Sequence, residues 1–208
     1  SAVGSTTWMS GITWNGSLYV ATGRSGACAT SPDGITWTNR TGLASAGVVG
    51  YFVNVCYGNS IFVAVDTDGK CATSTNGISW TIQTIPAGGY LDVIWSGSIF
   101  VAAGNTGICA TSSNGTSWTQ QTGLYSVVGA TNMNAIVWNG TIFVVVDDTG
   151  KCATSPNGVT WTLRTSFATY FGSNSAYGVV WTGTSFIAIG LPSPGCVSST
   201  DGITWTAE

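Results

Sequence analysis

Residues 152–162, Cys-Ala-Thr-Ser-Pro-Asn-Gly-Val-Thr-Trp-Thr, recur four more times in this chain of 208 residues. Each copy keeps the pattern Asx-Gly-x-Ser/Thr-Trp, and the copies begin at Cys28, Cys71, Cys109 and Cys196. Asx-Gly is a strong hairpin signal because both residues tolerate the positive φ of a tight primed turn. The stretch therefore predicts a strand, a turn and a second strand, and its recurrence predicts a repeat architecture.

Two series of aromatic residues measure the period of the repeat. The tryptophans of the recurring turn are 43 or 44 residues apart, with one shorter step of 38, and they are Trp37, Trp80, Trp118, Trp161 and Trp205. A second series has its 38-residue step at the same place, and consists of Trp14, Tyr57, Trp95, Trp138 and Trp181. The shortening therefore lies in a single connection, around residues 84–91.

Within one repeat, β-branched and aromatic runs alternate with Gly, Asn and Asp, which predicts four strands. In the fourth repeat these runs are 135–138, 141–146, 151–154 and 159–165. Five repeats of about 42 residues predict an all-β, single five-bladed β-propeller over residues 1–208, with four antiparallel strands per blade. The expected blades are 8–42, 43–85, 86–123, 124–167 and 168–208. A trefoil has three repeats, and a linear solenoid needs polar caps that this sequence lacks.

Up-and-down strands divide the loops of such a fold between two faces. One face holds the recurring Asx-Gly turns and varies little among repeats. The other holds the turns between the second and third strands together with the variable connections 43–53, 85–91, 124–134 and 167–177. Because loops on a rigid scaffold commonly carry binding groups, we expect a ligand on the second face.

The charge composition excludes several kinds of partner. Charged residues are 6% of the chain, only five are basic, and the net charge is −3. Such a chain has no electrostatic footprint for nucleic acid or an anionic membrane. No apolar run reaches the ~18 residues that a membrane-spanning helix needs, so we expect no membrane insertion.

The cysteines and acidic turns predict no metal and no cofactor. Five of the six cysteines hold the same place in successive repeats, too far apart to bridge, so we expect free and mostly buried thiols. Histidine is absent, which disfavours a transition-metal site. Asp66 with Asp68, and Asp147 with Asp148, could offer calcium ligands, but turn formation is the simpler interpretation because the other repeats lack the pair.

The recurring turn, Ser-x-Asx-Gly-x-Ser/Thr-Trp, resembles the Asp-box of sialidase-type (BNR) repeat propellers. The five matches are residues 31–37, 74–80, 112–118, 155–161 and 199–205. The usual box is one residue longer between the acid and the tryptophan, and three of the five acids are Asn here. The resemblance implies a structural turn at the blade periphery, in which the Asx side chain caps its own turn and the Trp packs inward.

Catalysis is not predicted. The sialidase resemblance would require an arginine triad, a Tyr/Glu nucleophilic pair and an acidic proton donor. Glu208 is the only Glu, and Arg40 and Arg164 share one repeat position that we expect to be a solvated edge. Without His, neither a Ser-His nor a Cys-His pair can be built.

The aromatics that do not recur are the candidate binding residues. Tyrosines in or beside the variable connections stand near Asn and Asp, a combination that offers a sugar both a stacking face and hydrogen-bonding groups. These candidates are Tyr51, Asn54, Tyr90, Asp92, Tyr125, Asn132, Asn134, Tyr170, Asn174 and Tyr177. The same residues could instead anchor the loops to the core.

The sequence thus predicts a non-enzymatic binding module, with a lectin-like, carbohydrate-binding role through the variable loop face as the first hypothesis. Its partner is then a glycan or cell-surface ligand. The alternative is a structural or adhesive protein-binding module of a virion or cell surface, and a sialidase-like hydrolase is a remote third. Either of the first two predicts an extracellular, virion-surface or cell-surface location.

Overall fold

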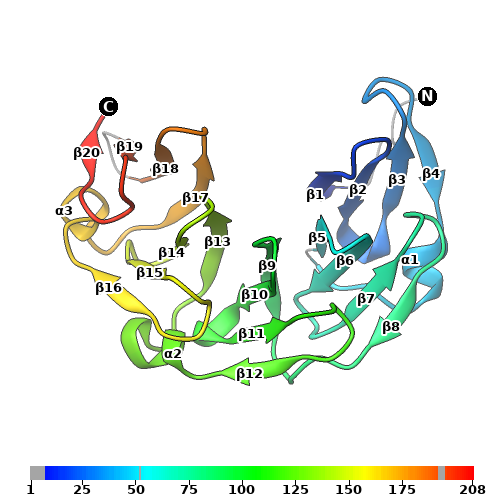
Figure 1. Ribbon diagram of the computed structural model, residues 1–208, viewed down its shortest axis with the longest axis horizontal. Coiled ribbons are helices and arrows are strands. Elements are labelled where there is room, and N and C mark those ends of the chain that lie inside the picture. Colours follow the sequence, from blue (N-terminus) through cyan, green and yellow to red (C-terminus); the bar gives the residue numbers. More distant parts are fainter. Residues whose placement is uncertain (1–7, 52, 192–194) are drawn as a thin grey trace. The chain divides into compact units, whose positions relative to one another are not determined.

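The computed structural model describes residues 8–51, 53–191 and 195–208 (Figure 1). Twenty strands follow one another along the described part of the chain. The first two sheets are built from β1 (Met9–Trp14), β2 (Tyr19–Gly23), β3 (Cys28–Ser31), β4 (Thr38–Arg40), β5 (Val53–Gly58), β6 (Ile61–Asp66), β7 (Cys71–Ser74) and β8 (Thr81–Gln83). The third contains β9 (Tyr90–Trp95), β10 (Phe100–Gly104), β11 (Cys109–Ser112) and β12 (Thr119–Gln121). The last two contain β13 (Met133–Trp138), β14 (Phe143–Asp147), β15 (Cys152–Ser155), β16 (Thr162–Arg164), β17 (Ala176–Trp181), β18 (Phe186–Gly190), β19 (Cys196–Ser199) and β20 (Thr206–Ala207).

Each group of four strands forms one sheet, which we call a blade. Within a blade the strands are hydrogen-bonded in sequence order, as β1-β2-β3-β4 illustrates. The register repeats: Cys28 pairs with Arg40 across β3 and β4, and Cys152 pairs with Arg164 across β15 and β16. The predicted all-β chain of five four-stranded blades is confirmed, because turns with positive-φ glycines connect strands that are rich in β-branched residues.

The chain divides into two compact units. Unit 1 comprises Ser1–Ala102 with Ala110–Thr119, and unit 2 comprises Ala103–Cys109 with Gln120–Glu208. Blades one and two belong to unit 1, blades four and five belong to unit 2, and the third blade has residues in both. Each unit is described by itself below, and the single propeller domain expected over 1–208 stays a prediction.

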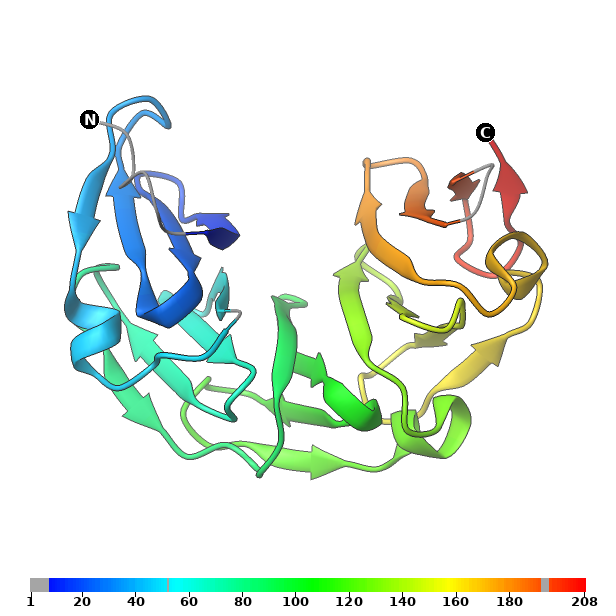
Figure 2. The same ribbon diagram turned by 180° about the vertical axis from the view of Figure 1, so that it is seen from behind.

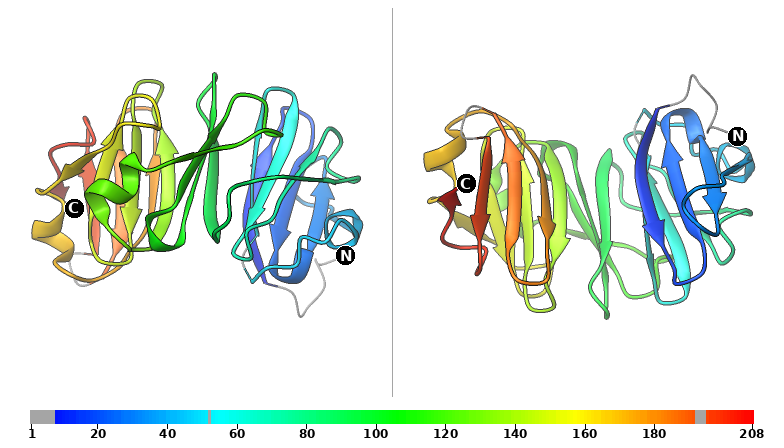
Figure 3. Two further views of the ribbon diagram at one scale, coloured as in Figure 1. Left: turned by 90° about the horizontal axis from the view of Figure 1, so that it is seen from below. Right: turned by 90° about the horizontal axis from the view of Figure 1, so that it is seen from above.

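Consecutive blades pack face to face inside each unit. In unit 1, β5 lies against β1 and β2, and β9 lies against β5 and β6 (Figure 3). In unit 2, β17 lies against β13 and β14 in the same way. The buried layers between blades consist of Val, Ala, Phe and the recurring Cys and Trp, such as Val20, Phe62 and Trp80 in unit 1 and Val144, Phe186 and Trp205 in unit 2. Burial of these apolar faces is the main force that stacks one blade on the next.

The recurring cysteines are part of these layers. All six are free, five of them are buried, and Cys196 is partly exposed. The thiols of Cys28 and Cys109 each contact the turn of the following blade, at 3.8 Å from the Gly77 carbonyl and 3.7 Å from the Gly158 carbonyl. The prediction of free, mostly buried thiols is confirmed, and they serve as small apolar groups.

The recurring turns are held by their own Ser and Asx side chains. In the fourth blade, the Ser155 hydroxyl accepts a hydrogen bond from Gly158 N, and the Asn157 side chain accepts one from Thr160 N at 2.9 Å. The same pair of bonds recurs in the other four turns. The tryptophans that follow are buried at positions 80, 161 and 205 and half-buried at 37 and 118.

Three connections contain short helices that the sequence did not predict: α1 (Gly42–Ser45), α2 (Gly123–Val128) and α3 (Ala168–Phe171). Figure 2 shows them from behind, each following the last strand of a blade. Helices of four to six residues are too short for an apolar period to show in the sequence. In the described part of the chain, no helix is both long and apolar enough to cross a membrane.

Candidate functional site

In each unit, the turn between the second and third strands lies against the connections beside it. The single helical turn η1 (Arg24–Gly26) follows β2, and Ser25 N donates to the Gly50 carbonyl at 3.0 Å. Its counterpart η2 (Asn105–Gly107) follows β10, and Gly107 N donates to the Thr131 carbonyl. In blade four, Asp148 N donates to the Asn132 carbonyl at 3.0 Å. The turns and connections therefore share one face in each unit, which is the face on which we expected a ligand.

An exposed cation–π pair is the most prominent feature of this face in unit 1. The guanidinium carbon of Arg24 lies 4.2 Å from the centroid of the Tyr51 ring. Tyr51 is 45% exposed, Arg24 is exposed, and Val49 beside them is 52% exposed. A stacked Arg–Tyr pair keeps both side chains ordered at an accessible position, at a gain of about 0.5–1 kcal/mol.

A buried carboxylate fixes the backbone under this pair. Asp66 is fully buried, and its side chain accepts hydrogen bonds from Gly50 N at 3.0 Å and Lys70 N at 2.8 Å. Tyr51 N donates to the Thr67 hydroxyl at 3.0 Å. The connection between blades one and two is thereby hydrogen-bonded to β6 and the β6–β7 turn at Gly50 and Tyr51.

Basic side chains line one hollow on this face in each unit. The hollow of unit 1 has a volume of about 250 Å³ and is lined by Arg24, Arg40 and neighbouring residues of η1, β4 and α1. The hollow of unit 2 has a volume of about 420 Å³ and is lined by Lys151, Arg164 and residues of the β14–β15 turn, β16 and α3. We call these the basic hollows. Neither lining contains an Asp or Glu.

The concentration of charge in the basic hollows is high for this chain. Only five of the 208 residues are basic, and four of those five line the two hollows. The Nε groups of Arg40 and Arg164 donate to Thr30 and Thr154 at 2.9 and 2.8 Å, and the Lys151 ammonium donates to the Val128 carbonyl. These bonds orient the cations. In unit 1 the oriented guanidinium groups suit a carboxylate or another small anion, whereas the exposed lining of the unit 2 hollow is mostly apolar.

Arg40 and Arg164 lie on the edge strands β4 and β16, as expected, but they are not fully solvated. Both side chains are half-buried, because each sits opposite the cysteine that begins the third strand and is bonded to a threonine of that strand. Arg24 and Lys151 were not among the binding residues predicted from the sequence. A usable signal was present: the strand register places the ends of β4 and β16 beside the turns that carry Arg24 and Lys151.

The predicted tyrosines differ in accessibility. Tyr51, Tyr125 and Tyr177 are exposed, at 45%, 54% and 55%. Tyr90 is fully buried and its hydroxyl donates to the Pro86 carbonyl, so its selection as a binding residue was wrong. Tyr170 packs against the core of unit 2 and its hydroxyl donates to the Trp205 carbonyl, so its ring is a wedge between blades and not a free stacking face.

The predicted amides and the predicted carboxylate are bonded within the protein. Asn54 donates to Asp92 at 2.7 Å in unit 1. In unit 2, Asn132 donates to the Asp148 carboxylate at 2.7 Å, Asn134 donates to the Ala176 carbonyl, and Asn174 donates to the Phe171 carbonyl. Among the predicted residues of unit 1, the structure thus brings Asn54 and Asp92 together. Hydrogen-bonding groups that already have partners in the protein bind sugar hydroxyls weakly.

The acidic turns follow the simpler of the two interpretations. Asp66 accepts backbone hydrogen bonds from Asp68 and Lys70, and Asp147 accepts them from Thr149 and Lys151. Asp148 is bonded to Asn132. Across residues 8–51, 53–191 and 195–208, no group of three or more His, Cys, Asp or Glu side chains could hold a metal ion.

The thiol beside the basic hollow of unit 1 is not an activated nucleophile. Burial raises the pKa of Cys28 to about 11, although Trp80 and Arg40 both act to lower it. The thiol is therefore protonated near neutral pH, and the thiolate is the reactive form. What the hollow offers is a set of oriented hydrogen-bond donors and positive charge, which is suited to binding.

Comparison with known proteins identifies the fold. No family model and no curated protein matches the chain. Solved structures do match. "YCF48 bound to D1 peptide" aligns with a TM-score of 0.67 at 17% identity, over 98% of this chain and 68% of that one. The nidogen/laminin complex gives 0.65 at 10% identity, over 93% and 76%, and the WD40 β-propeller domain of Doa1 gives 0.64 at 11%, over 96% and 67%. The protein is therefore a β-propeller with five blades; at these identities the likeness shows the fold alone.

Proposed function

We propose that this propeller is a non-enzymatic binding module that recognises an acidic peptide segment of a partner protein. The observation that carries the proposal is the placement of four of the five basic residues in the two basic hollows, with the exposed Arg24–Tyr51 pair at the edge of one of them. A peptide carboxylate fits between Arg24 and Arg40, and a neighbouring apolar side chain fits on Tyr51 and Val49.

Protein recognition suits this face better than the lectin-like role. Arg and Tyr are the residue types that dominate binding energy at protein interfaces. The Asn side chains needed for sugar hydroxyls are bonded to the protein itself. Two similar structures are complexes, one of YCF48 with a D1 peptide and one of nidogen with laminin, which supports the choice of a protein ligand by analogy of fold.

The recurring turns have a structural role in this proposal. Their Ser and Asx side chains accept backbone hydrogen bonds within the turn, as in an Asp-box. We therefore keep the Asp-box as the proposed repeat type and assign it no chemistry. A surface location, on a virion or a cell, is proposed with the binding role.

The test is selection from a random dodecapeptide display library on the immobilised protein, followed by fluorescence anisotropy of the selected peptides. We expect selected peptides to contain Asp or Glu, and R24Q or Y51A to weaken them at least ten-fold. K70Q is the matched control, since Lys70 is the one basic residue outside the hollows. Selected peptides without acidic residues, or peptides that bind R24Q and K70Q equally well, would reject the proposal. An unselective peptide screen with strong hits on a glycan array would restore the lectin-like role.

A further inference from the structure

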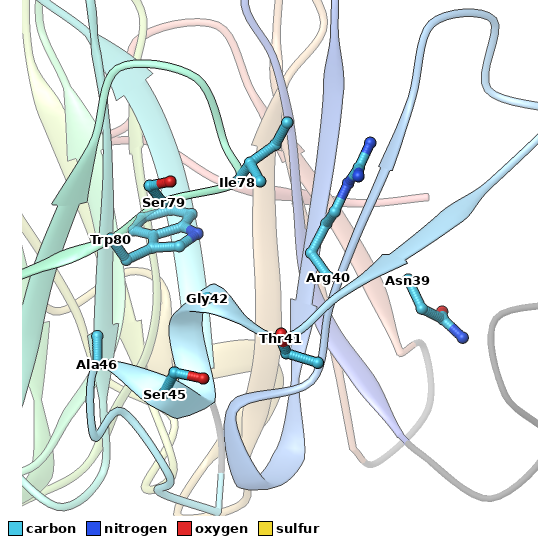
Figure 4. A pocket seen from close by; sticks show the side chains of 9 residues that line it. All are labelled: Asn39, Arg40, Thr41, Gly42, Ser45, Ala46, Ile78, Ser79 and Trp80. Atoms are coloured by element: carbon cyan, nitrogen blue, oxygen red, sulfur yellow. The ribbon is translucent and has the colours of Figure 1, made fainter.

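A second cavity lies at the junction of blades one and two and shares Asn39, Arg40 and Thr41 with the basic hollow of unit 1. It has a volume of about 540 Å³, and we call it the Arg40–Trp80 pocket (Figure 4). Figure 4 shows Ile78, Ser79 and Trp80 of the blade-two turn facing Arg40 and Thr41 at the end of β4, with Ser45 and Ala46 of the connection below. Pockets of 300–1,000 Å³ are the size that binds small molecules.

The matching junction in unit 2 shows that this pocket is a particular feature and not a property of every repeat. Tyr170 stands where Ala46 stands in blade one, and its hydroxyl donates to the carbonyl of Trp205, the counterpart of Trp80. Ser166 stands in place of Gly42 and donates to the Ile203 carbonyl, the counterpart of Ile78. The tyrosine ring occupies the space that the small Ala46 side chain leaves open.

Close backbone approach forms the floor of the Arg40–Trp80 pocket. A Cβ on Gly42 would lie 1.9 Å from the Ile78 carbonyl oxygen, so only glycine lets α1 begin directly under the next blade. This contact holds the Ser79–Trp80 segment against the start of the connection. The pocket therefore has a fixed wall on each side, which lowers the entropy cost of binding.

The polar groups of the pocket indicate the chemistry of its ligand. Among its nine lining residues Arg40 alone is charged, and the Nε–Thr30 bond leaves the terminal guanidinium nitrogens available. Thr41, Ser45 and Ser79, which carry hydroxyl groups, also line the pocket. The Trp80 side chain, 8% exposed, forms the apolar wall of the pocket, and its indole N–H is buried beside the Cys28 thiol.

We propose that the Arg40–Trp80 pocket binds a small hydroxylated carboxylate of the hexuronic acid class. One guanidinium fork matches one carboxylate, whereas a phosphate dianion would lack a second cation. Ring hydroxyls of the ligand pair with the Ser and Thr hydroxyls, and an uncharged hexose lacks the group that engages Arg40. This site goes beyond the peptide-binding role: it shares Arg40 with the basic hollow of unit 1, but Ile78, Ser79 and Trp80 of blade two line only this pocket.

Two substitutions test the proposal, and each introduces the residue found at the equivalent position of another blade. R40Q copies Gln83, which takes the same position in blade two and donates to Thr73 at 2.9 Å, so it removes the charge and keeps the local hydrogen bond. A46Y copies Tyr170 and should fill the pocket while Arg40 itself is kept. R164Q removes the equivalent arginine in unit 2 and is the matched control.

Glucuronate is titrated into ¹⁵N-labelled protein, and the NMR signal of the Trp80 indole N–H is followed. This signal is assigned by its absence from the spectrum of W80F. We expect this signal to saturate with glucuronate and not with glucose. We expect at least a ten-fold loss of affinity in R40Q, no saturation in A46Y, and an unchanged affinity in R164Q. Absence of saturation in the wild type, equal binding of glucose or acetate, or wild-type binding by A46Y would each overturn the proposal. If A46Y does not fold, A46L narrows the same space, and the glucuronate affinity of R40Q still tests the role of Arg40. R24Q separates the two proposals, because it should weaken peptide binding at least ten-fold and leave glucuronate binding unchanged, since Arg24 does not line the Arg40–Trp80 pocket.

Discussion

Replacement of Trp161 by alanine should destabilise unit 2 by about 4 kcal/mol. The indole is 5% exposed, its ring centroid lies 6.4 Å from that of Phe143, and its N–H donates to the Gly158 carbonyl at 3.2 Å. Burial of about 200 Å² of such a ring, at about 25 cal/mol per Å², contributes about 5 kcal/mol. Alanine keeps a small part of that area, and the range for buried large aromatics is about 3–5 kcal/mol.

The assay is urea unfolding followed by circular dichroism, together with hydrogen exchange of β15 and β16 to locate the loss. V159A is the matched control: it lies in the same turn, is 40% exposed, and should change the free energy of unfolding by less than about 0.5 kcal/mol. A loss below about 1 kcal/mol for W161A at an unchanged denaturant slope would refute the reasoning that the recurring tryptophans form the layer between blades.

Three further outcomes follow from the structure. Iodoacetamide at pH 8 should label Cys196 first in the folded protein, because burial raises the pKa of the Cys71 and Cys109 thiols to about 12; mass spectrometry of tryptic peptides would contradict this if Cys71 reacted as fast. The carboxyl of Asp33 should titrate with a pKa of about 2, since the N–H groups of residues 36 and 35 and the Ser31 hydroxyl bond to the charged form. Its pKa is thus below the ordinary 3.8, so the turn keeps this stabilisation above about pH 4 and loses it as the pH falls toward 2; D33N should remove that dependence, and an NMR midpoint near 4 would contradict it. S25G should raise the free energy of unfolding by about 0.5–1 kcal/mol, because Ser25 adopts a left-handed φ of 58°, and an unchanged urea midpoint would show that the turn carries no strain.

The basic hollows show why sequence reasoning found only part of the site. Tyr51 was selected because it breaks the repeat, and the structure leaves it exposed beside Arg24. Arg40 was discounted because its repeat position holds Gln in two other blades, which is typical of a solvated edge. What matters for Arg40 is its partner across the strand and the turn next to it, and neither is a neighbour in the sequence.

Tyr90 and Tyr170 failed as binding residues for a related reason. Non-recurring aromatics in variable connections are equally suited to hold a loop on the core and to face a ligand. The deciding factor is whether the neighbouring blade covers the ring, as it does where Tyr170 meets the Trp205 carbonyl. The difference between Tyr170 and the small Ala46 then leaves an open pocket at one junction and a filled one at the other.

The amino-acid sequence by itself determined the number of blades, the strands within each blade and the recurring turns. These depend on local signals, namely β-branched runs and Asx-Gly pairs, repeated at a period that leaves one architecture. The tertiary structure decided which side chains are exposed, which amides are already bonded and where four of the five basic residues gather. Those properties arise from contacts between residues far apart in the chain, and their free energies depend on burial, which no local pattern specifies.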